Sequence, residues 1–369
     1  MPYFPQGAPE MGYLRHLILL YGRDISIWNA ERIRPYLAYM NEDGKPLDWF
    51  FDSLLFVPMT AASGRSFGSD VNLGTTMCGE GDFYPIPVPN PATRKDYDDL
   101  LDVYFGDGGY LDAMNAGVES LKCELPAPAH KHNAVLMTPY PGIMQPMWGR
   151  LPGSDKCLNF STVKQGITPA TMDRLAATNW FADECVARWD DARWPNVSFL
   201  GFYWPFETVY HGWEVDDHLL LKEHHKHLKQ LGKVMTWIPF SSTYNTHLLD
   251  NYQDYYFDLA FQQPNHMFYV NTPGIEGPAA VAKARNAGFE MEYYLEWGEP
   301  FAVLDERQKR FRDYLNGGAK FGFMKEAACA WYHGRNGIAQ MWDHEDPVER
   351  AYYHDIYRFV KGTYEIKED

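Results

Sequence analysis

Short apolar segments alternate with longer amphipathic segments along most of this chain. Eight of the short segments are rich in β-branched and aromatic residues and end in polar, glycine or proline residues. This pattern is typical of buried strands. The predicted strands span residues 16–22, 49–57, 134–138, 197–203, 234–238, 259–262, 289–293 and 327–332.

The segments between these strands carry apolar residues at helical spacing. Thr168 before Pro169 marks a helix start. Gly232, Gly288 and Gly317 mark helix ends, because glycine commonly terminates a helix. The predicted helices span residues 161–190, 216–231, 278–287, 305–315 and 355–361.

Strands that alternate with helices predict an α/β fold, most simply a (β/α)8 TIM barrel that forms a single domain over residues 1–369. A doubly wound sheet is the alternative. No GxGxxG or GxxxxGK[ST] follows the first strand, which disfavours the nucleotide-binding versions of that alternative. Long insertions follow strands two and three, at 58–100 and 142–163. In a barrel both lie at the C-terminal face, where sites are built, so both are candidate substrate contacts.

Composition narrows the choice of partner. The formal net charge of −16 argues against nucleic acid and against an anionic membrane surface, because both bind basic patches. No apolar run reaches the roughly 18 residues needed for a membrane span. Aromatic residues make up 16% of the chain, more than a core needs. They indicate either an aromatic core or a cleft whose flat rings stack on sugars.

Neither a cofactor nor a metal site is predicted. The five cysteines are scattered without a CxxC pair, so neither a zinc ribbon nor a redox pair is indicated. His224 and His227 lie one turn apart on a predicted helix, but its many charges favour a solvated face. The N-terminus lacks the basic and apolar regions of a signal peptide. If a leader was removed from the natural chain, a periplasmic or secreted location is favoured.

Glu207 is the first candidate catalytic residue. It follows the strongly apolar fourth strand and the aromatic residues Trp204 and Phe206. Partial desolvation there is expected to raise the pKa of the carboxyl group, which suits a general acid near neutral pH. The alternative is a loop glutamate that faces water.

Glu290 and Glu292 lie within the seventh strand. Period-two alternation places both on one face, which points into the barrel if the register is right. Buried carboxylates are costly unless they are paired, hydrogen-bonded or functional. Glu292 is nearer the C-terminal end and is the predicted nucleophile or base, whereas Glu290 lies deeper and is expected to need a Lys or Arg partner. A register shifted by one residue would turn both outward.

Other polar and aromatic residues lie near predicted strand ends, where sugar hydroxyls and ring faces could be bound. Any single tryptophan among them fits a core position as well as a sugar platform, and Asp52 fits a structural role as well as hydroxyl binding. The predicted substrate-binding residues are Arg23, Asp52, Tyr140, Trp204, Trp237, Gln263, Asn265, Glu290, Glu296 and Trp297.

Carboxylates after strand four and on strand seven form the pair used by many retaining glycosidases that have a barrel fold. The resemblance to that glycosidase clan is one of architecture, because Phe206 precedes Glu207 where the clan has Asn. The predicted function is a glycoside hydrolase acting on a polysaccharide or oligosaccharide. Glu207 is its general acid/base, Glu292 is its nucleophile, and retention is favoured over inversion.

A closer resemblance covers most of the chain. The segments LILLYG, WFFDSLLF, PYP, GFYWPFE, WIPF, QQPN, FEMEYY and AWYHG, in this order, resemble the bacterial family known as domain of unknown function 4855. The resemblance implies a barrel, an extracytoplasmic setting and a role in carbohydrate metabolism, without a settled activity. Tyr294 stands where an acid is expected after this motif, so no acidic role is carried over to it.

Two other functions remain open. In a non-catalytic carbohydrate-binding barrel, the rings would stay as platforms and the carboxylates would only bind hydroxyls. In a metal-assisted hydrolase, Asp and His at strand ends would hold the ion. Release of reducing ends separates the first alternative from the glycosidase, and sensitivity to a chelator identifies the second.

Overall fold

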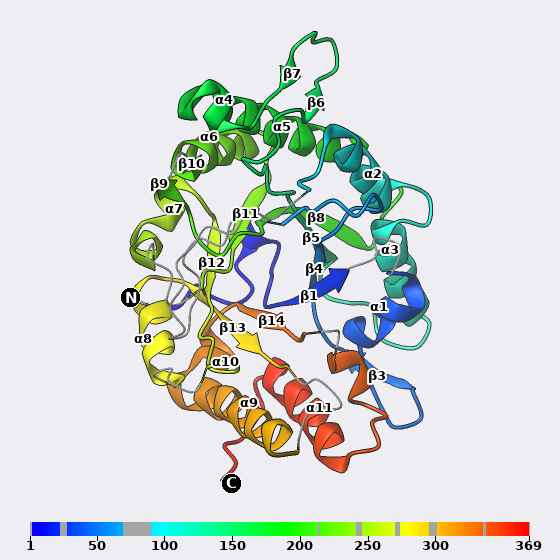
Figure 1. Ribbon diagram of the computed structural model, residues 1–369. Helices are drawn as coiled ribbons and strands as arrows, with labels where there is room; N and C mark the ends of the chain where they lie inside the picture. Colours follow the sequence, from blue (N-terminus) through cyan, green and yellow to red (C-terminus); the bar gives the residue numbers. More distant parts are fainter. Residues whose placement is uncertain are drawn as a thin grey trace.

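In the computed structural model, eight parallel strands close into a barrel inside a ring of helices (Figure 1). The structure describes residues 2–22, 28–68, 90–212, 215–240, 246–269, 274–294, 301–334 and 337–368. The barrel strands are β1 (His16–Gly22), β4 (Ser53–Pro58), β5 (His132–Met137), β8 (Val197–Trp204), β11 (Val234–Trp237), β12 (Leu259–Gln262), β13 (Gly288–Glu292) and β14 (Cys329–Tyr332). They neighbour one another in chain order, and β1 pairs with both β4 and β14 to close the sheet. The (β/α)8 barrel predicted from the sequence is therefore confirmed.

Helices follow the strands and cover the outside of the barrel. They are α1 (Ala30–Leu37), α2 (Arg94–Phe105), α3 (Tyr110–Leu121), α4 (Thr162–Gln165), α5 (Ile167–Arg188), α6 (Asp217–Gln230), α7 (Tyr252–Tyr255), α8 (Glu276–Ala284), α9 (Phe301–Phe321), α10 (Phe323–Glu326) and α11 (Pro347–Val360).

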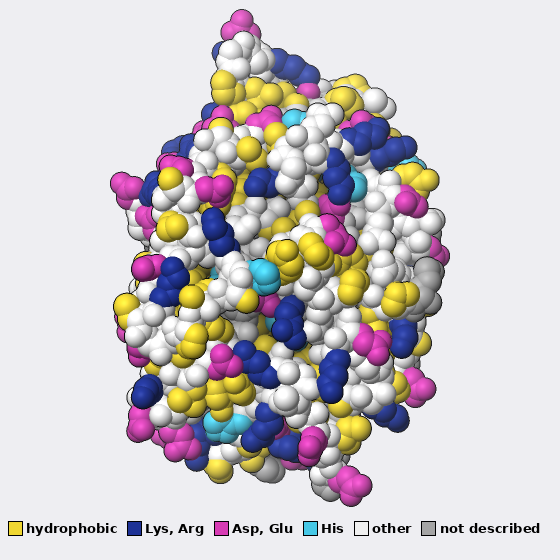
Figure 2. All heavy atoms as spheres, turned by 180° about the vertical axis from the view of Figure 1, so that it is seen from behind, with side chains coloured by type: hydrophobic (Ala, Val, Ile, Leu, Met, Phe, Trp, Pro, Cys, Tyr) yellow, Lys and Arg dark blue, Asp and Glu magenta, His cyan; other side chains and the backbone are white. Residues whose placement is uncertain are grey.

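None of the helices in the described ranges is long and apolar enough to cross a membrane. Acidic and basic side chains are interspersed over the face that Figure 2 shows.

The second strand, predicted over residues 49–57, starts later than predicted. Residues Pro46–Trp49 form β3, which pairs with β2 (Ala38–Met40) in an antiparallel hairpin before the barrel strand. The chain then bends and enters the barrel only at Ser53, where β4 begins. An apolar run that continues through a bend hides this break, because alternation does not show where the chain changes direction.

The helix predicted to stop at Gly317 continues to Phe321 and ends before Gly322, whose φ of +90° favours glycine. Gly317 instead allows close packing, since a Cβ atom there would lie 2.6 Å from the Ile275 side chain. Glycine at a helix contact and glycine at a helix end cannot be distinguished without the neighbouring elements.

Insertions after the second and third barrel strands are present. After β5 the chain forms the small hairpin of β6 (Gly149–Arg150) and β7 (Cys157–Leu158) before it reaches α5, and this hairpin projects beyond the ring of helices at the top of Figure 1. A third hairpin, β9 (His211–Gly212) with β10 (Val215–Asp216), follows β8. These segments extend from the C-terminal ends of barrel strands, where sites are built in this fold.

Candidate active site

Glu207 lies just past the end of β8 and is partly exposed. The next strand along the barrel fixes its backbone, because the Glu207 carbonyl accepts a hydrogen bond from the Phe240 N–H at 3.1 Å. The Trp237 indole N–H also donates to the Phe206 carbonyl at 2.9 Å. Two bonds from the end of β11 therefore hold the turn that carries Glu207.

The environment of Glu207 raises its pKa to about 7, because burial disfavours the charged carboxylate. A hydrogen bond with the Gln263 side chain opposes that rise. Gln263 reaches this position because it forms a parallel bridge with Phe240, directly after β12. Near neutral pH the Glu207 carboxyl can thus both hold and release a proton, as a general acid/base requires.

Glu290 and Glu292 are both buried on β13, with 1% and 0% of their surfaces exposed. Phe289, which directly precedes Glu290 on this strand, stacks on Phe323 of α10, with ring centroids 4.0 Å apart. The aromatic side chain therefore packs against the helices, and strand alternation gives the two carboxyl groups the opposite face.

Glu292 has several hydrogen-bond donors around its carboxyl group. The Tyr314 hydroxyl of α9 donates to Oε2, and backbone N–H groups of Asn265 and Met267 favour the ionised form. Burial nevertheless raises the pKa of Glu292 to about 8, and the negative charge of Glu207 adds to the rise. The charge of Glu207, which follows β8, therefore acts on the carboxyl group of Glu292 at the end of β13.

Glu290 lacks such support. Its Oε2 atom, like the Oε1 atom of Glu292, is buried without a hydrogen-bond partner among the described residues. Burial raises the pKa of Glu290 well above the ordinary value, and the charges of Glu292 and Glu207 raise it further. The expected Lys or Arg partner is not found in the described part of the chain, so protonation is what makes the burial of Glu290 tolerable.

Tyrosines surround the three carboxyl groups. Burial and the charges of Glu207 and Glu290 raise the pKa values of Tyr21 and Tyr203. The Tyr21 ring lies edge-on to Tyr332 at 5.5 Å, and Tyr294 stacks on Tyr332 at 6.4 Å. Tyr21, Tyr294 and Tyr332 are partly exposed, so their faces are available to a ligand at the mouth of the barrel.

Three of the rings predicted to bind sugar are buried beneath the site. Trp204 and Trp237 are 0% exposed and Tyr140 is 2% exposed, so none of them offers a face to a ligand. Tyr140 packs edge-on against Trp204 at 5.3 Å, and its hydroxyl donates to Asp217 at 3.0 Å. These three rings support the site from below, because the outer helices close over the strand ends that carry them.

Asp52 does not lie near the glutamates. It directly precedes β4 and therefore lies at the N-terminal end of the barrel. Its Oδ1 atom accepts hydrogen bonds from the Arg15 backbone N–H at 3.1 Å and the Ser53 hydroxyl at 2.7 Å. The prediction that it binds substrate with the others is wrong in position, because the strand that carries it starts later than the sequence suggests.

Arg23, Glu296 and Trp297 lie outside the described residues. Asn265, like Gln263, does lie beside the glutamates, where its backbone meets Glu292. In the described ranges no group of three His, Cys, Asp or Glu residues is arranged to hold a metal ion. His224 is buried rather than solvated, and its ring is 2.7 Å from the Asn179 side-chain oxygen.

The sequence places Tyr21, Tyr294 and Tyr332 at or near predicted strand ends, where a cleft is expected, but they are not among the predicted substrate-binding residues. Tyr21 and Tyr332 lie at the C-terminal ends of β1 and β14, where sites are built in this fold. Tyr314 has no such signal, because it lies on an outer helix and reaches Glu292 only through the packing of α9 on the barrel.

The fold and the mouth together define a class: a (β/α)8 barrel with an acidic, tyrosine-lined site at the C-terminal ends of its strands. The family model for the domain of unknown function DUF4855 matches residues 16–358, and the chain belongs to this family. No curated protein matches the sequence.

Solved structures with the same barrel fold share little sequence with this chain. A tryptophan synthase from M. tuberculosis is 10% identical, covers 97% of this chain and 99% of its own, and has a TM-score of 0.39. A psychrophilic glycoside hydrolase family 10 endo-β-1,4-xylanase is 7% identical, covers 90% of this chain and 89% of its own, and has a TM-score of 0.41. A likeness at this level supports no conclusion about activity.

Proposed function

We propose that this protein is a glycoside hydrolase in which Glu207 is the general acid/base and Glu292 is the nucleophile. One observation carries the proposal: Glu207 directly follows the fourth barrel strand and Glu292 ends the seventh, so both carboxyl groups lie at the C-terminal mouth, with no cation paired to them among the described residues. Two such carboxyl groups are not both ionised at neutral pH. One of them can therefore be the acid and the other the nucleophile of glycosidic cleavage.

The hydrogen-bond donors around the two carboxyl groups indicate which glutamate is the acid/base and which is the nucleophile. When Glu207 is protonated, its charge no longer raises the pKa of Glu292, and the donors at Tyr314, Asn265 and Met267 stabilise ionised Glu292. Glu207 has one such donor, the Gln263 side chain. Because the pKa of Glu207 is about 7 and that of Glu292 is about 8, Glu207 loses its proton first in the free protein. The state that starts the reaction, with the proton on Glu207 and the charge on Glu292, is therefore the minor form of the pair, and a bound substrate oxygen that accepts a hydrogen bond from Glu207 would favour it.

The surroundings suit a sugar. The partly exposed rings of Tyr21, Tyr294 and Tyr332 provide flat apolar faces near Glu207. The Gln263 side chain hydrogen-bonds Glu207, and the Gln263 and Asn265 side-chain oxygens beside the glutamates are buried without partners among the described residues. Residues 58–100 and 142–163, which follow the second and third strands, remain proposed contacts for a longer chain.

The test is reducing-end release from a panel of plant, bacterial and host polysaccharides. Glu207→Gln and Glu292→Gln should each lower turnover by at least about 100-fold while the fold is retained. Glu326→Gln is the matched control, because Glu326 is an exposed glutamate next to the opposite end of the barrel, and it should behave like the wild type.

Two results would contradict the proposal. Unchanged turnover in a folded Glu292→Gln variant would exclude the assigned nucleophile. Saturable polysaccharide binding by the wild type, with no reducing ends released from any substrate, would instead indicate the non-catalytic carbohydrate-binding barrel.

A further inference from the structure

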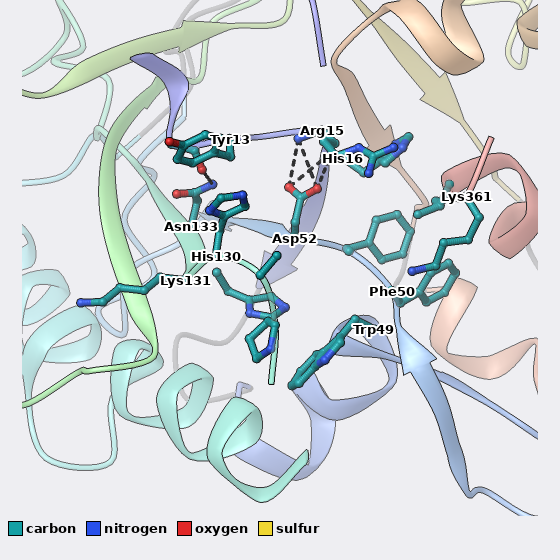
Figure 3. A pocket seen from close by; sticks show the side chains of 16 residues that line it. Tyr13, Arg15, His16, Trp49, Phe50, Asp52, His130, Lys131, Asn133 and Lys361 are labelled. Atoms are coloured by element: carbon teal, nitrogen blue, oxygen red, sulfur yellow. Dashed lines mark hydrogen bonds between the residues drawn. The ribbon is translucent and has the colours of Figure 1, made fainter. Parts of the chain in front are cut away.

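A second hollow lies at the opposite end of the barrel from the glutamates. It has a volume of about 200 Å³. Its lining comes from the segments that lead into β1, β4 and β5 and from the end of α11, at residues 12–16, 49–52, 128–133 and 360–361 (Figure 3). This end of a barrel ordinarily serves stability, so an open hollow with a carboxylate in its lining calls for an explanation.

The floor of the hollow is a fixed carboxylate. Asp52 accepts hydrogen bonds from the backbone N–H groups of Arg15 and His16, drawn as dashed lines in Figure 3. The Ser53 hydroxyl donates to it as well. These bonds hold the carboxylate in one orientation while it stays partly exposed, so it can still accept a hydrogen bond from a ligand.

One histidine of the lining has a buried nitrogen without a partner among the described residues. His132 is 3% exposed and its Nδ1 atom is unpaired. His16 is 1% exposed and its ring is already engaged, because Nδ1 accepts from the Trp331 indole at 3.2 Å and the ring also hydrogen-bonds the Val360 backbone. Buried polar atoms are almost always hydrogen-bonded, so the His132 nitrogen calls for a polar partner.

Aromatic rings form the sides. The partly exposed Trp49 lies at 5.0 Å from the His132 ring, and its indole N–H is held by the Pro126 carbonyl at 2.6 Å. Across the hollow, Tyr13 and His130 stack on each other at 3.8 Å. The Trp49 ring is therefore rigidly placed, with an apolar surface next to hydrogen-bonding groups.

We propose that this hollow binds one neutral pyranose ring of a carbohydrate, stacked on Trp49 with its hydroxyls on Asp52 and His132. A sugar ring combines an apolar face with an edge of donors and acceptors, which is the combination that this lining presents. The size of the hollow suits one sugar unit. Among the described residues Asp52 is the one carboxylate of the lining, and Arg15, Lys131 and Lys361 also line the hollow, so the test compares neutral sugars with anions.

The site goes beyond the proposed hydrolysis, since it would hold a polysaccharide without cleaving it. The experiment therefore uses the full-length Glu207→Gln/Glu292→Gln double variant, in which the mouth cannot turn over a sugar. Calorimetric titration and saturation-transfer NMR with D-glucose, D-xylose, D-glucuronate and inorganic phosphate measure binding. We expect saturable, millimolar binding of glucose or xylose.

Trp49→Ala should weaken that binding by about tenfold or more. Tyr255→Ala, which removes another exposed ring on α7, should leave it unchanged. Trp49→Phe keeps a ring and should retain most of the affinity, and its melting temperature reports on the fold if the alanine variant is unstable. Because cleavage and binding are measured separately, failure of the hydrolase proposal leaves this test intact.

Three results would overturn the proposal. Equal sugar binding by the Glu207→Gln/Glu292→Gln variant with and without Trp49→Ala would place the sugar elsewhere. Binding of phosphate or glucuronate without binding of glucose or xylose would make the hollow an anion site. The absence of saturable binding by every probe would make it an unoccupied structural feature.

Discussion

The hydroxyl group of Tyr314 on α9 donates a hydrogen bond to the buried carboxyl group of Glu292 at the end of β13. The same hydroxyl oxygen accepts the backbone N–H of His266 at 3.1 Å. An outer helix therefore reaches the barrel mouth and joins the proposed nucleophile to the segment that follows β12.

Removal of this hydroxyl should raise the pKa of Glu292. In Tyr314→Phe the ionised carboxylate loses a donor, so the acidic limb of the pH–rate profile should move to higher pH. Turnover near neutral pH should fall by roughly tenfold, the cost of about one hydrogen bond to a charged group. Tyr364→Phe, whose hydroxyl bonds Asn316 instead, is the control. An unshifted profile would show that Tyr314 has only a structural role.

The two glutamates should respond differently to the leaving group. With an aryl glycoside whose phenol leaves easily, Glu207→Gln should retain much of its rate of bond cleavage, because little protonation is needed. Glu292→Gln should lose activity on every substrate, because no glycosyl intermediate can form. Rates measured across a series of phenols of rising pKa check this, and equal losses in both variants would argue against the division of roles.

Glu290 should make the fold less stable as the pH rises. Its pKa is higher in the folded than in the unfolded chain, so the folded state binds more protons, and the free energy of unfolding falls as pH increases above the ordinary value of 4.5. Glu290→Gln removes this dependence. Its melting temperature relative to the wild type should therefore rise as pH increases from 5 to 8.

The Glu290→Gln variant must be compared with the wild type at each pH, because buried histidines change the stability of the fold with pH in the opposite direction. Burial lowers the pKa of His16 to about 3 and that of His132 to about 4, so both destabilise the fold as pH falls below the ordinary value of 6.5. These contributions cancel in the difference between Glu290→Gln and the wild type. A difference independent of pH would mean that Glu290 is ionised in the folded protein.

The ion pair between Arg174 and Asp217 should be costly to break. Both side chains are fully buried and lie 2.6 Å apart, and Asp217 also accepts the Tyr140 hydroxyl. Arg174→Met leaves a buried charge without its partner and should cost about 3–5 kcal/mol in urea unfolding. The double variant Arg174→Met/Asp217→Leu should recover part of that loss. Lys95→Met, in an exposed pair with Asp99, should change little.

Much of the architecture was readable from the sequence because it depends on local patterns. Eight apolar runs predicted the eight barrel strands closely, and the alternation in the run from Gly288 to Glu292 gave both carboxyl groups one face. The position of Glu207 after the fourth strand followed from the same pattern. The exact start of β4 did not, since the apolar residues around Phe50 and Phe51 continue through a bend.

The sequence by itself determined the barrel, the order of its strands and the strand ends that carry Glu207 and Glu292, because hydrophobic periodicity acts over a few residues. Tertiary structure alone decided which rings are exposed, which carboxyl groups meet and where Asp52 lies. Trp204 and Trp237 are as aromatic as Tyr21 and Tyr332, but the helices cover the first two and leave the others partly open. Burial and charge coupling depend on neighbours that are distant in the chain, and local composition does not encode those neighbours.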